Sequence, residues 1–376
     1  MTPSRKFVIF IFVVGIFAAG LCQGFTIALK KPLWNDEIFS QVSSVEGKSW
    51  PVIWTGRIGE GNNSPLFYSI QKAICKAFNY RSEDLWHKDD IRARFILRIA
   101  PVFCMSLGMA LIAWFLCVYY SLLGGLIGFI VSISSYMVWY YWAEARPYAL
   151  IFLAATVQAL ALFYYCRFEK KLSFWGMMAA NLFVAFAFSL SVIQIVASGV
   201  MLWVKGYRRI WPLLLSVGLP LGVAFGYHIA APHYSFFFGP YGKPYQLIFA
   251  NIPSGRLAAF FIFPALVLGW DWYIKKERKI ALWPFFAWAW LTFFGYIAFI
   301  GYLKYLTLFQ ESPQFEVSNR YFMALTPLGI IAVSVGILEL VKRPRALWAR
   351  AMVWAVALAI ILPRLAKAFH WMMNGL

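Results

Sequence analysis

FVIFIFVVGIFAAGLCQGFTIAL, residues 7–29, is the stretch that decides the fold. Its 23 residues include no charged side chain, and a helix needs about 20 mainly apolar residues to cross a bilayer. The run is longer than the apolar part of a signal peptide, which is about 7–15 residues. Leu21 stands where a lipoprotein cleavage site would need a small residue before Cys22. The stretch therefore predicts an uncleaved first membrane helix.

The rest of the chain continues this pattern. Hydrophobic residues make up 62% of the 376 residues, aromatic residues make up 20%, and the mean hydropathy is +0.69. A soluble domain is about 45–50% apolar. We predict an all-α polytopic membrane protein with about 11 transmembrane helices, forming one membrane domain over residues 1–376 without a C-terminal soluble domain. The later apolar runs are 96–120, 122–142, 147–166, 174–189, 193–204, 213–231, 257–274, 281–303, 321–340 and 347–362.

Cationic residues set the expected orientation. The chain has 34 Lys and Arg against 15 Asp and Glu, a net charge of +19. In a soluble protein this excess would suggest nucleic acid, but here it gathers between the apolar runs, as in cytoplasmic loops that face anionic lipid. We therefore expect membrane lipids and no nucleic acid as partners, a cytoplasmic N-terminus, and residues 30–91 outside. The basic junctions hold Arg167, Lys170, Lys171, Lys205, Arg208, Arg209, Lys275, Lys276, Arg278, Lys279, Lys342, Arg343 and Arg345.

Residues 30–91 form the long polar loop, which contains Trp34-Asn35-Asp36-Glu37-Ile38-Phe39. The acidic pair has two interpretations. Acids favour the first turn of a helix, and a carboxylate at a membrane surface can also be the base that activates an acceptor. Later in the loop, Ser64-Pro65 predicts a helix start, and residues 66–78 predict a helix lying on the membrane surface.

Other charged and aromatic residues fall at the same expected side of the membrane. Glu144 and Arg146 precede Tyr148 at the start of the fourth apolar run, and Arg320 precedes the tenth, which begins at Tyr321. Charged residues next to membrane spans are functional candidates, although interfacial anchoring by snorkelling side chains explains them too. His233 and Lys243 belong to the loop after the seventh run, where packing or contact with lipid is the alternative. At the opposite side we expect only basic clusters.

These residues favour one kind of chemistry. A carboxylate can take a proton from an acceptor hydroxyl, and guanidinium groups can hold a phosphate and stabilise its developing charge. A nucleotide-sugar donor would need metal-binding carboxylates on the cytoplasmic side, where Glu169 and Glu277 are isolated. No cofactor is required by this chemistry and no metal site is indicated, although a divalent metal would be compatible with it.

Four short motifs resemble the GT-C fold glycosyltransferases, in the branch that includes protein O-mannosyltransferases and lipid A aminoarabinose transferases. They are Asp36-Glu37, the segment at residues 64–68, Glu144-Ala145-Arg146-Pro147-Tyr148, and Asn319-Arg320-Tyr321-Phe322. The resemblance implies a GT-C-like helix bundle with juxtamembrane helices in the first extracytoplasmic loop. It also implies an inverting hexosyl or pentosyl transfer from a polyprenyl-phosphate sugar donor to a lipid, glycan or protein acceptor. A bacterial inner-membrane enzyme with its active site facing the periplasm is expected.

The resemblance also implies roles for residues. Asp36 would be the general base, with Glu37 beside it positioning the acceptor or the loop. Arg146 and Arg320 would contact the donor phosphate, while Glu144, Tyr148 and Tyr321 would line the cavity. Lys243 and His233 lie outside the matching motifs, and their expected place at the same outer surface adds Lys243 to the phosphate contacts and His233 to the cavity. Asn63-Ser64 departs from the family's His-Pro, which puts a histidine contact there in doubt.

Three other functions remain open from the sequence. A transporter or flippase of lipid-linked saccharides would show inverted repeats and broken helices, and the short pair of runs at 174–204 favours it. A polysaccharide polymerase or ligase of another fold would concentrate arginines and histidines in a late loop. A structural subunit would leave the acidic pair and the Glu144-Arg146 motif without a role.

Overall fold

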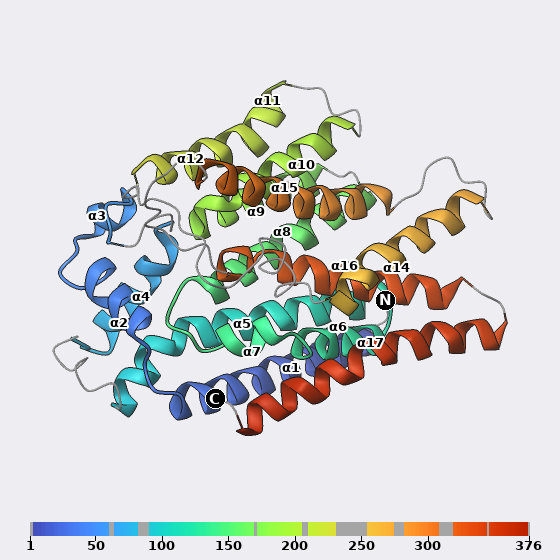
Figure 1. The fold of residues 1–376 in the computed structure, drawn as a ribbon, viewed down its shortest axis with the longest axis horizontal. Coiled ribbons are helices and arrows are strands. Elements are labelled where there is room, and N and C mark those ends of the chain that lie inside the picture. Colours follow the sequence, from blue (N-terminus) through green and yellow to red (C-terminus); the bar gives the residue numbers. More distant parts are fainter. Residues whose placement is uncertain are drawn as a thin grey trace.

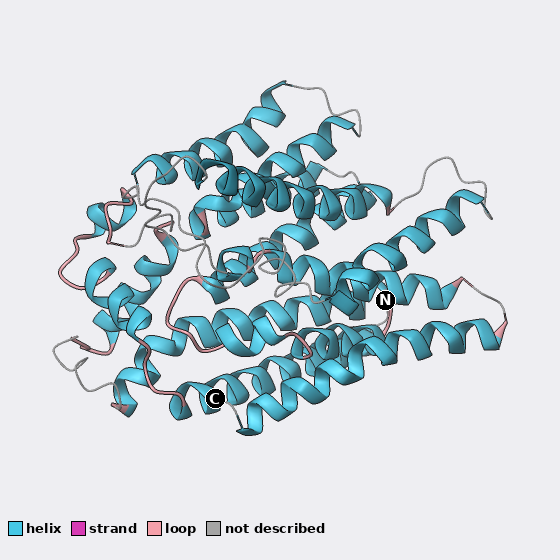
Figure 2. Ribbon diagram, viewed as in Figure 1, coloured by secondary structure: helices cyan, strands magenta, loops and turns pink. Residues whose placement is uncertain are grey.

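The computed structural model describes residues 3–59, 64–81, 90–168, 171–204, 210–230, 254–273, 282–307, 319–343 and 346–374. Within these ranges the chain forms helices and connecting loops and contains no strand, as Figure 2 shows. The first helix, α1 (Pro3–Lys30), covers the apolar stretch at residues 7–29 and runs toward the end of the bundle where α2, α3 and α4 gather (Figure 1). The predicted all-α class is therefore confirmed.

Seven helical segments of the described chain are long and apolar enough to cross a membrane. The protein is thus an integral membrane protein. Four further apolar helical segments are shorter than 18 residues, so the number of about 11 crossings stays a prediction. The seven are α1, α5 (Ile91–Tyr119), α8 (Tyr148–Phe168), the continuous segment from α11 (Ile210–Leu213) through the π-helical η3 (Leu214–Gly218) to α12 (Leu219–Ala230), α15 (Trp283–Thr307), α16 (Leu325–Lys342) and α17 (Leu347–Asn374).

The four shorter apolar segments are α6 (Leu122–Ile133), residues 174–187 of α9 (Lys171–Ala187), residues 189–204 with α10 (Val192–Val204), and residues 259–273 of α14 (Ser254–Tyr273). The short 3-10 turn η2 (Ser189–Ser191) joins α9 to α10, as the pair of runs at 174–204 predicts. The prediction of one helix over 122–142 is wrong, because α6 ends at Ile133 and α7 (Tyr136–Tyr141) begins separately. Ser132 and Ser134 donate hydroxyl hydrogen bonds to backbone carbonyls of the preceding turn, a competition that bends or ends helices.

The centre of the bundle is built by α16, α8 and α5. In the most apolar 18-residue stretch of each helix, 83%, 78% and 67% of the residues are buried. A glycine allows α16 to pack closely against α14, because a Cβ at Gly336 of α16 would lie 2.8 Å from the Cβ of Phe263 on α14. Such contacts are the usual means of helix association in membranes. Two of the predicted site residues directly precede central helices: Arg146 lies just before α8, and Arg320 lies shortly before α16.

One end of the bundle carries the polar loop between α1 and α5, folded into α2 (Asn35–Ser44), α3 (Trp50–Trp54) and α4 (Leu66–Ala77) (Figure 1, left). The predicted helix over 66–78 is confirmed, with Pro65 as its N-cap. The Ser64 hydroxyl donates a 2.7 Å hydrogen bond to the Ala185 carbonyl near the end of α9. This hydrogen bond connects the polar loop to the helix bundle.

Candidate functional site

The acidic pair stands in the first turn of α2, so the helix-start interpretation is correct. Glu37 Oε2 accepts a 2.9 Å hydrogen bond from the backbone N–H of Trp34, the residue that caps the helix. Acidic side chains at this position satisfy a donor that has no partner within the helix and favour its positive end. This role does not exclude chemistry, because the two acids have different surroundings.

Glu37 is held by a buried ion pair with Arg98 of α5. Arg98 donates from Nε to Oε1 at 2.9 Å and from Nη2 to Oε2 at 2.6 Å. Both side chains are 0% exposed. Oε1 also accepts the Ala145 N–H at 2.7 Å, so Glu37 fixes the loop that precedes α8. The other Arg98 hydrogen bonds go to the carbonyls of Ala28, Lys31 and Pro32.

Asp36 points instead into a cluster with two arginines, which we call the Asp36 cluster (Asp36, Arg146, Arg320). Arg146 Nη1 donates to Asp36 Oδ2 at 2.7 Å, and Arg320 Nη1 donates to the same oxygen at 2.6 Å. The side chains of Asp36, Arg146 and Arg320 are 34%, 8% and 16% exposed. Consecutive helical residues point about 100° apart, which explains why Asp36 and Glu37 face different partners. The cluster is a partly exposed, net positive site.

The three members of this cluster come from distant parts of the chain. Asp36 lies in α2, Arg146 in the loop between α7 and α8, and Arg320 in the 3-10 helix η4 (Asn319–Phe322) that precedes α16. The expectation from sequence that these residues share one end of the bundle holds, and the contacts bring them within hydrogen-bond distance. Two guanidinium groups that meet at one carboxylate oxygen can also bind another anion, such as a phosphate.

Glu144 borders the cluster but is sealed from water. Its side chain is buried, and neither carboxylate oxygen has a hydrogen-bond partner among the described residues. The pKa of the Glu144 carboxyl is raised to about 7, mainly by burial and also by the Glu37 carboxylate, while Arg146, Lys31 and Arg320 oppose the shift. A carboxyl group in such a position can hold or release a proton near neutral pH.

Tyr148 lies beside Arg146, next to the Asp36 cluster. Its ring lies 4.8 Å from the Tyr141 ring, measured between centroids, and the Arg146 guanidinium lies 5.3 Å from the Tyr148 ring centroid. This cation–π contact restricts where the Arg146 side chain can point. Tyr321 belongs to η4, while His233 and Lys243, also predicted as site residues, fall outside the described residues.

Sequence reasoning missed Arg98. An arginine inside the apolar run at 96–120 is unusual and is a functional candidate by default, so the pattern contained a usable indication. Its partner is not visible in the sequence, because Glu37 lies 61 positions earlier. Lys31 was also missed; its ammonium lies 4.7 Å from the Tyr140 ring centroid, at the edge of the same region.

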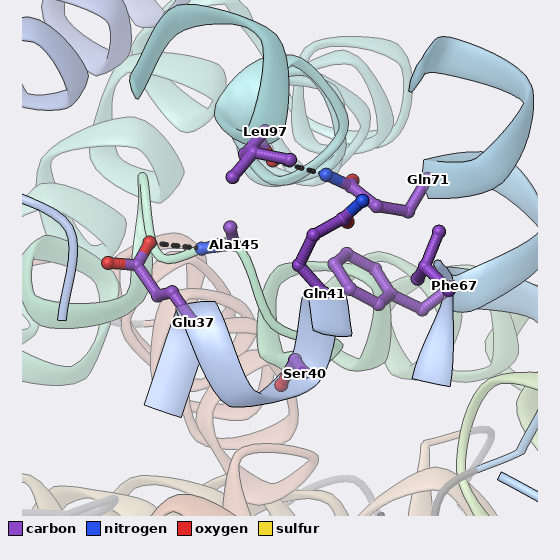
Figure 3. Close-up of a pocket in the computed structure, with 8 residues that line it drawn as sticks. Glu37, Ser40, Gln41, Phe67, Gln71, Leu97 and Ala145 are labelled. Carbon is purple, nitrogen blue, oxygen red and sulfur yellow. Dashed lines mark hydrogen bonds between the residues drawn. The ribbon is translucent and has the colours of Figure 1, made fainter. Parts of the chain in front are cut away.

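A narrow pocket lies behind Glu37, between α2, α4 and α5, as Figure 3 shows. Gln71 donates a 3.0 Å hydrogen bond to the Leu97 carbonyl there, and the amide oxygens of Gln41 and Gln71 have no partner among the described residues. The space is too tight to admit even a water molecule. It therefore has no room for a sugar. The lining residues are Glu37, Ser40, Gln41, Val45, Phe67, Gln71, Leu97 and Ala145.

The opposite end of the bundle corrects one expectation. We expected only basic clusters there, but Arg343 donates to Asp271 Oδ2 at 2.6 Å and to Glu339 Oε2 at 2.8 Å. The Tyr120 hydroxyl donates to Glu339 Oε1 at 2.8 Å. We call Arg343, Asp271 and Glu339 the Arg343 cluster. Within the described ranges, neither end gathers three His, Cys, Asp or Glu side chains that could hold a metal ion.

Comparisons with known proteins bear on the fold. No family model matches the chain, and no curated protein matches its sequence. Among solved structures, the fold is similar to that of ArnT from Cupriavidus metallidurans bound to undecaprenyl phosphate. The TM-score is 0.54 at 13% identity, over 96% of this chain and 72% of that chain. At this identity the likeness concerns the fold alone, and it confirms the GT-C-like architecture expected from the motifs.

Proposed function

We propose that the protein is an inverting glycosyltransferase that moves a sugar from a polyprenyl-phosphate carrier to an acceptor hydroxyl. The observation that carries the proposal is the Asp36 cluster, in which two arginines and one partly exposed carboxylate meet at the α2 end of a membrane bundle. ArnT, with a similar fold, was crystallised with undecaprenyl phosphate. That similarity supports a polyprenyl-phosphate donor, whose lipid chain needs a site open to the bilayer.

The reaction is a single displacement. The Asp36 carboxylate accepts the proton of the acceptor hydroxyl while the hydroxyl oxygen forms a bond to the anomeric carbon. The bond from that carbon to the phosphate oxygen breaks, and its electron pair leaves with the phosphate. Because the acceptor attacks from the face opposite the leaving group, the configuration inverts. Arg146 and Arg320 stabilise the negative charge that develops on the phosphate.

The neighbouring residues support this chemistry. Glu37 acts as a positioning residue, because its hydrogen bonds to Arg98 and to the Ala145 N–H hold α2 and the Arg146 loop in place. We assign Glu144 and Tyr148, both buried, to the wall of the donor cavity. We assign Lys243 to the donor phosphate, and His233 and Tyr321 to the cavity, on the strength of their positions in the sequence.

The orientation follows from charge. We propose that the α2 end faces outside, in the periplasm of a bacterial inner membrane, because the short junctions at the other end carry more cationic residues than the short junctions at the α2 end. The acceptor is then a lipid, glycan or protein on that side. No step in the mechanism uses a cofactor.

A specific observation keeps transport as a second candidate. Inside the bundle, Gln158 of α8 donates to Asn181 of α9 at 2.8 Å, and Asn181 donates to Ser198 of α10 at 3.2 Å and to the Ser216 carbonyl in η3 at 2.8 Å. Polar chains beside an interrupted helix are typical of transporters. Hydrogen bonds between membrane helices explain the same cluster as packing.

Reconstitution separates these functions. The purified protein in liposomes is mixed with polyprenyl-phosphate sugars and candidate acceptors, after mass spectrometry has identified lipid-linked sugars that co-purify with it. Formation of a glycosylated product with inverted configuration supports the transferase. Movement of the lipid-linked sugar across the bilayer without product would reject the transferase in favour of the transporter.

Arg320→Ala provides a residue-level test. The loss of one charge-assisted contact should weaken donor affinity by about tenfold or more and change the acceptor KM much less. Arg343→Ala, an arginine in the Arg343 cluster at the opposite end, is the matched control. An unchanged donor affinity in the Arg320 variant would remove this residue from the phosphate site.

A further inference from the structure

The Asp36 cluster contains an arrangement that the proposed reaction does not by itself require. Both arginines donate to the same oxygen of the proposed base, Oδ2, at 2.7 and 2.6 Å. Neither of these two bonds falls on Oδ1. Arg146 and Arg320, which would bind the leaving phosphate, are therefore hydrogen-bonded to Asp36, which would take the proton of the acceptor.

A count of charges connects the two roles. The arginines bring two positive charges to the cluster, and Asp36 brings one negative charge. A sugar–phosphate–lipid donor is a phosphodiester with one further negative charge. During transfer the proton neutralises Asp36, and the electron pair of the broken carbon–oxygen bond turns the diester into a monoester, which carries up to two negative charges. The total is the same before and after, but the second charge has moved from Asp36 to the phosphate.

From this geometry we propose that Arg146 and Arg320 exchange their hydrogen-bond partner during transfer, from the Asp36 carboxylate to the phosphate. The inference rests on the proposed function. Before transfer, the Asp36 carboxylate competes with the donor phosphate for the arginines. After transfer, the protonated Asp36 no longer holds them, and both guanidinium groups bind the monoester. The return of the proton to solvent restores the Asp36 carboxylate, which displaces the spent carrier and prepares the site for the next donor.

The surroundings of the cluster allow this exchange. Asp36 is 34% exposed and Arg320 is 16% exposed, so a phosphate can approach from the open side without unfolding α2. Glu37 does not compete, because Arg98 and backbone N–H groups occupy its oxygens. The main chain is fixed around the cluster, while the side chains of three separate elements meet at one oxygen.

Asp36→Asn tests the exchange, since asparagine copies the shape and the neutral charge of the protonated acid. Binding of a polyprenyl phosphate monoester to the purified protein is measured beside that of a polyprenyl methyl phosphodiester. We expect the variant to bind the monoester about tenfold or more tightly than the parent does, with a smaller gain for the diester. Equal or weaker binding of the monoester would overturn the exchange, because Asp36 would then be aligning the arginines for the phosphate.

Two further variants show whether the gain has this cause. Asp36→Glu keeps the competing charge, so it should bind the monoester like the parent or more weakly. Asp36→Asn combined with Arg320→Gln should lose most of the gain, because the freed guanidinium is gone. A gain that survives in the double variant would also reject the exchange through Arg320.

The outcomes separate this inference from the proposed function. If the parent binds neither phosphate, and Arg146→Gln and Arg320→Gln change nothing, both the donor assignment and the exchange fail. If the parent binds the monoester and the arginine variants weaken binding, but Asp36→Asn gives no gain, the donor assignment stands and the exchange alone is rejected.

Discussion

Asp36 and Glu37 are adjacent, yet they belong to two different regions of the molecule. Glu37 and Arg98, which we call the Glu37 pair, are both 0% exposed, and each Glu37 oxygen accepts two hydrogen bonds. Asp36 is 34% exposed and holds two arginines on one oxygen. One region is complete and closed, and the other is open with an excess of positive charge. The difference indicates that the pair serves the fold and the Asp36 cluster serves the chemistry.

The largest expected effect tests the chemical half of this comparison. Asp36→Asn should lower the rate of sugar transfer by about 10²–10⁴-fold, the usual contribution of a general base. Its melting temperature should stay close to that of the parent, because asparagine keeps the size of the side chain and the cluster is partly exposed, so water can solvate the released arginines. Transfer is measured in proteoliposomes with stability followed by thermal unfolding. Transfer at the parent rate would show that another group takes the proton.

A second variant tests whether the Glu37 pair stabilises the fold. Arg98→Leu leaves a buried carboxylate without its partner and removes the donor to three backbone carbonyls. Loss of one member of a buried pair costs about 3–5 kcal/mol, so we expect a much lower melting temperature and poor recovery of folded protein. Adding Glu37→Gln to Arg98→Leu should restore part of the stability, because it removes the uncompensated charge. A single variant that melts like the parent would contradict the structural role of the pair.

The two regions differ in how far the sequence predicts them. The topology placed Asp36, Arg146 and Arg320 at one end of the bundle, because each follows or precedes an apolar run whose orientation the basic junctions indicate. The contact of both arginines with one oxygen depends on side-chain direction in α2 and η4, which no motif encodes. The Glu37 pair could not be predicted, since an arginine in an apolar run does not show which acid it meets.

The same limit applies elsewhere in the chain. Asp271 and Glu339 belong to different apolar runs, and only the packing of α14 against α16 brings both to Arg343. The break between α6 and α7 was missed because hydrophobic residues continue across it, while Ser132 and Ser134 end the helix through local hydrogen bonds. Long apolar helices were predictable from period and length, whereas polar contacts across the bundle were not.

Glu144 sharpens the comparison through pH, since it is as buried as the Glu37 pair but without its hydrogen bonds. Burial raises its pKa from the ordinary value of 4.5 to about 7. Between these values the folded protein binds a proton that the unfolded chain releases, so the free energy of unfolding falls as the pH rises. Glu144→Gln removes this dependence. Relative to the parent, the variant should gain on the order of 1–3 kcal/mol between pH 5 and pH 8.

Thermal unfolding at several pH values measures that difference. The parent should lose stability through the interval and show little further loss from this group above it, while the variant should lack this component. A constant difference between the two proteins from pH 5 to pH 8 would mean that Glu144 is not buried as an acid whose proton is held by the fold.

The smallest effect is expected at the Arg343 cluster, which reverses the charge pattern of the Asp36 cluster. Here one arginine is shared by two carboxylates, and the Tyr120 hydroxyl donates to Glu339. In Glu339→Gln the amide oxygen can accept from Arg343 while the amide N–H donates to the tyrosine oxygen, and Asp271 still balances the arginine. We therefore expect a stability loss of no more than about 1 kcal/mol and an unchanged rate of transfer. Asp36→Asn is the same exchange of carboxylate for amide beside arginine, so a loss of transfer in both variants would mean that the rate responds to the global charge of the bundle rather than to Asp36.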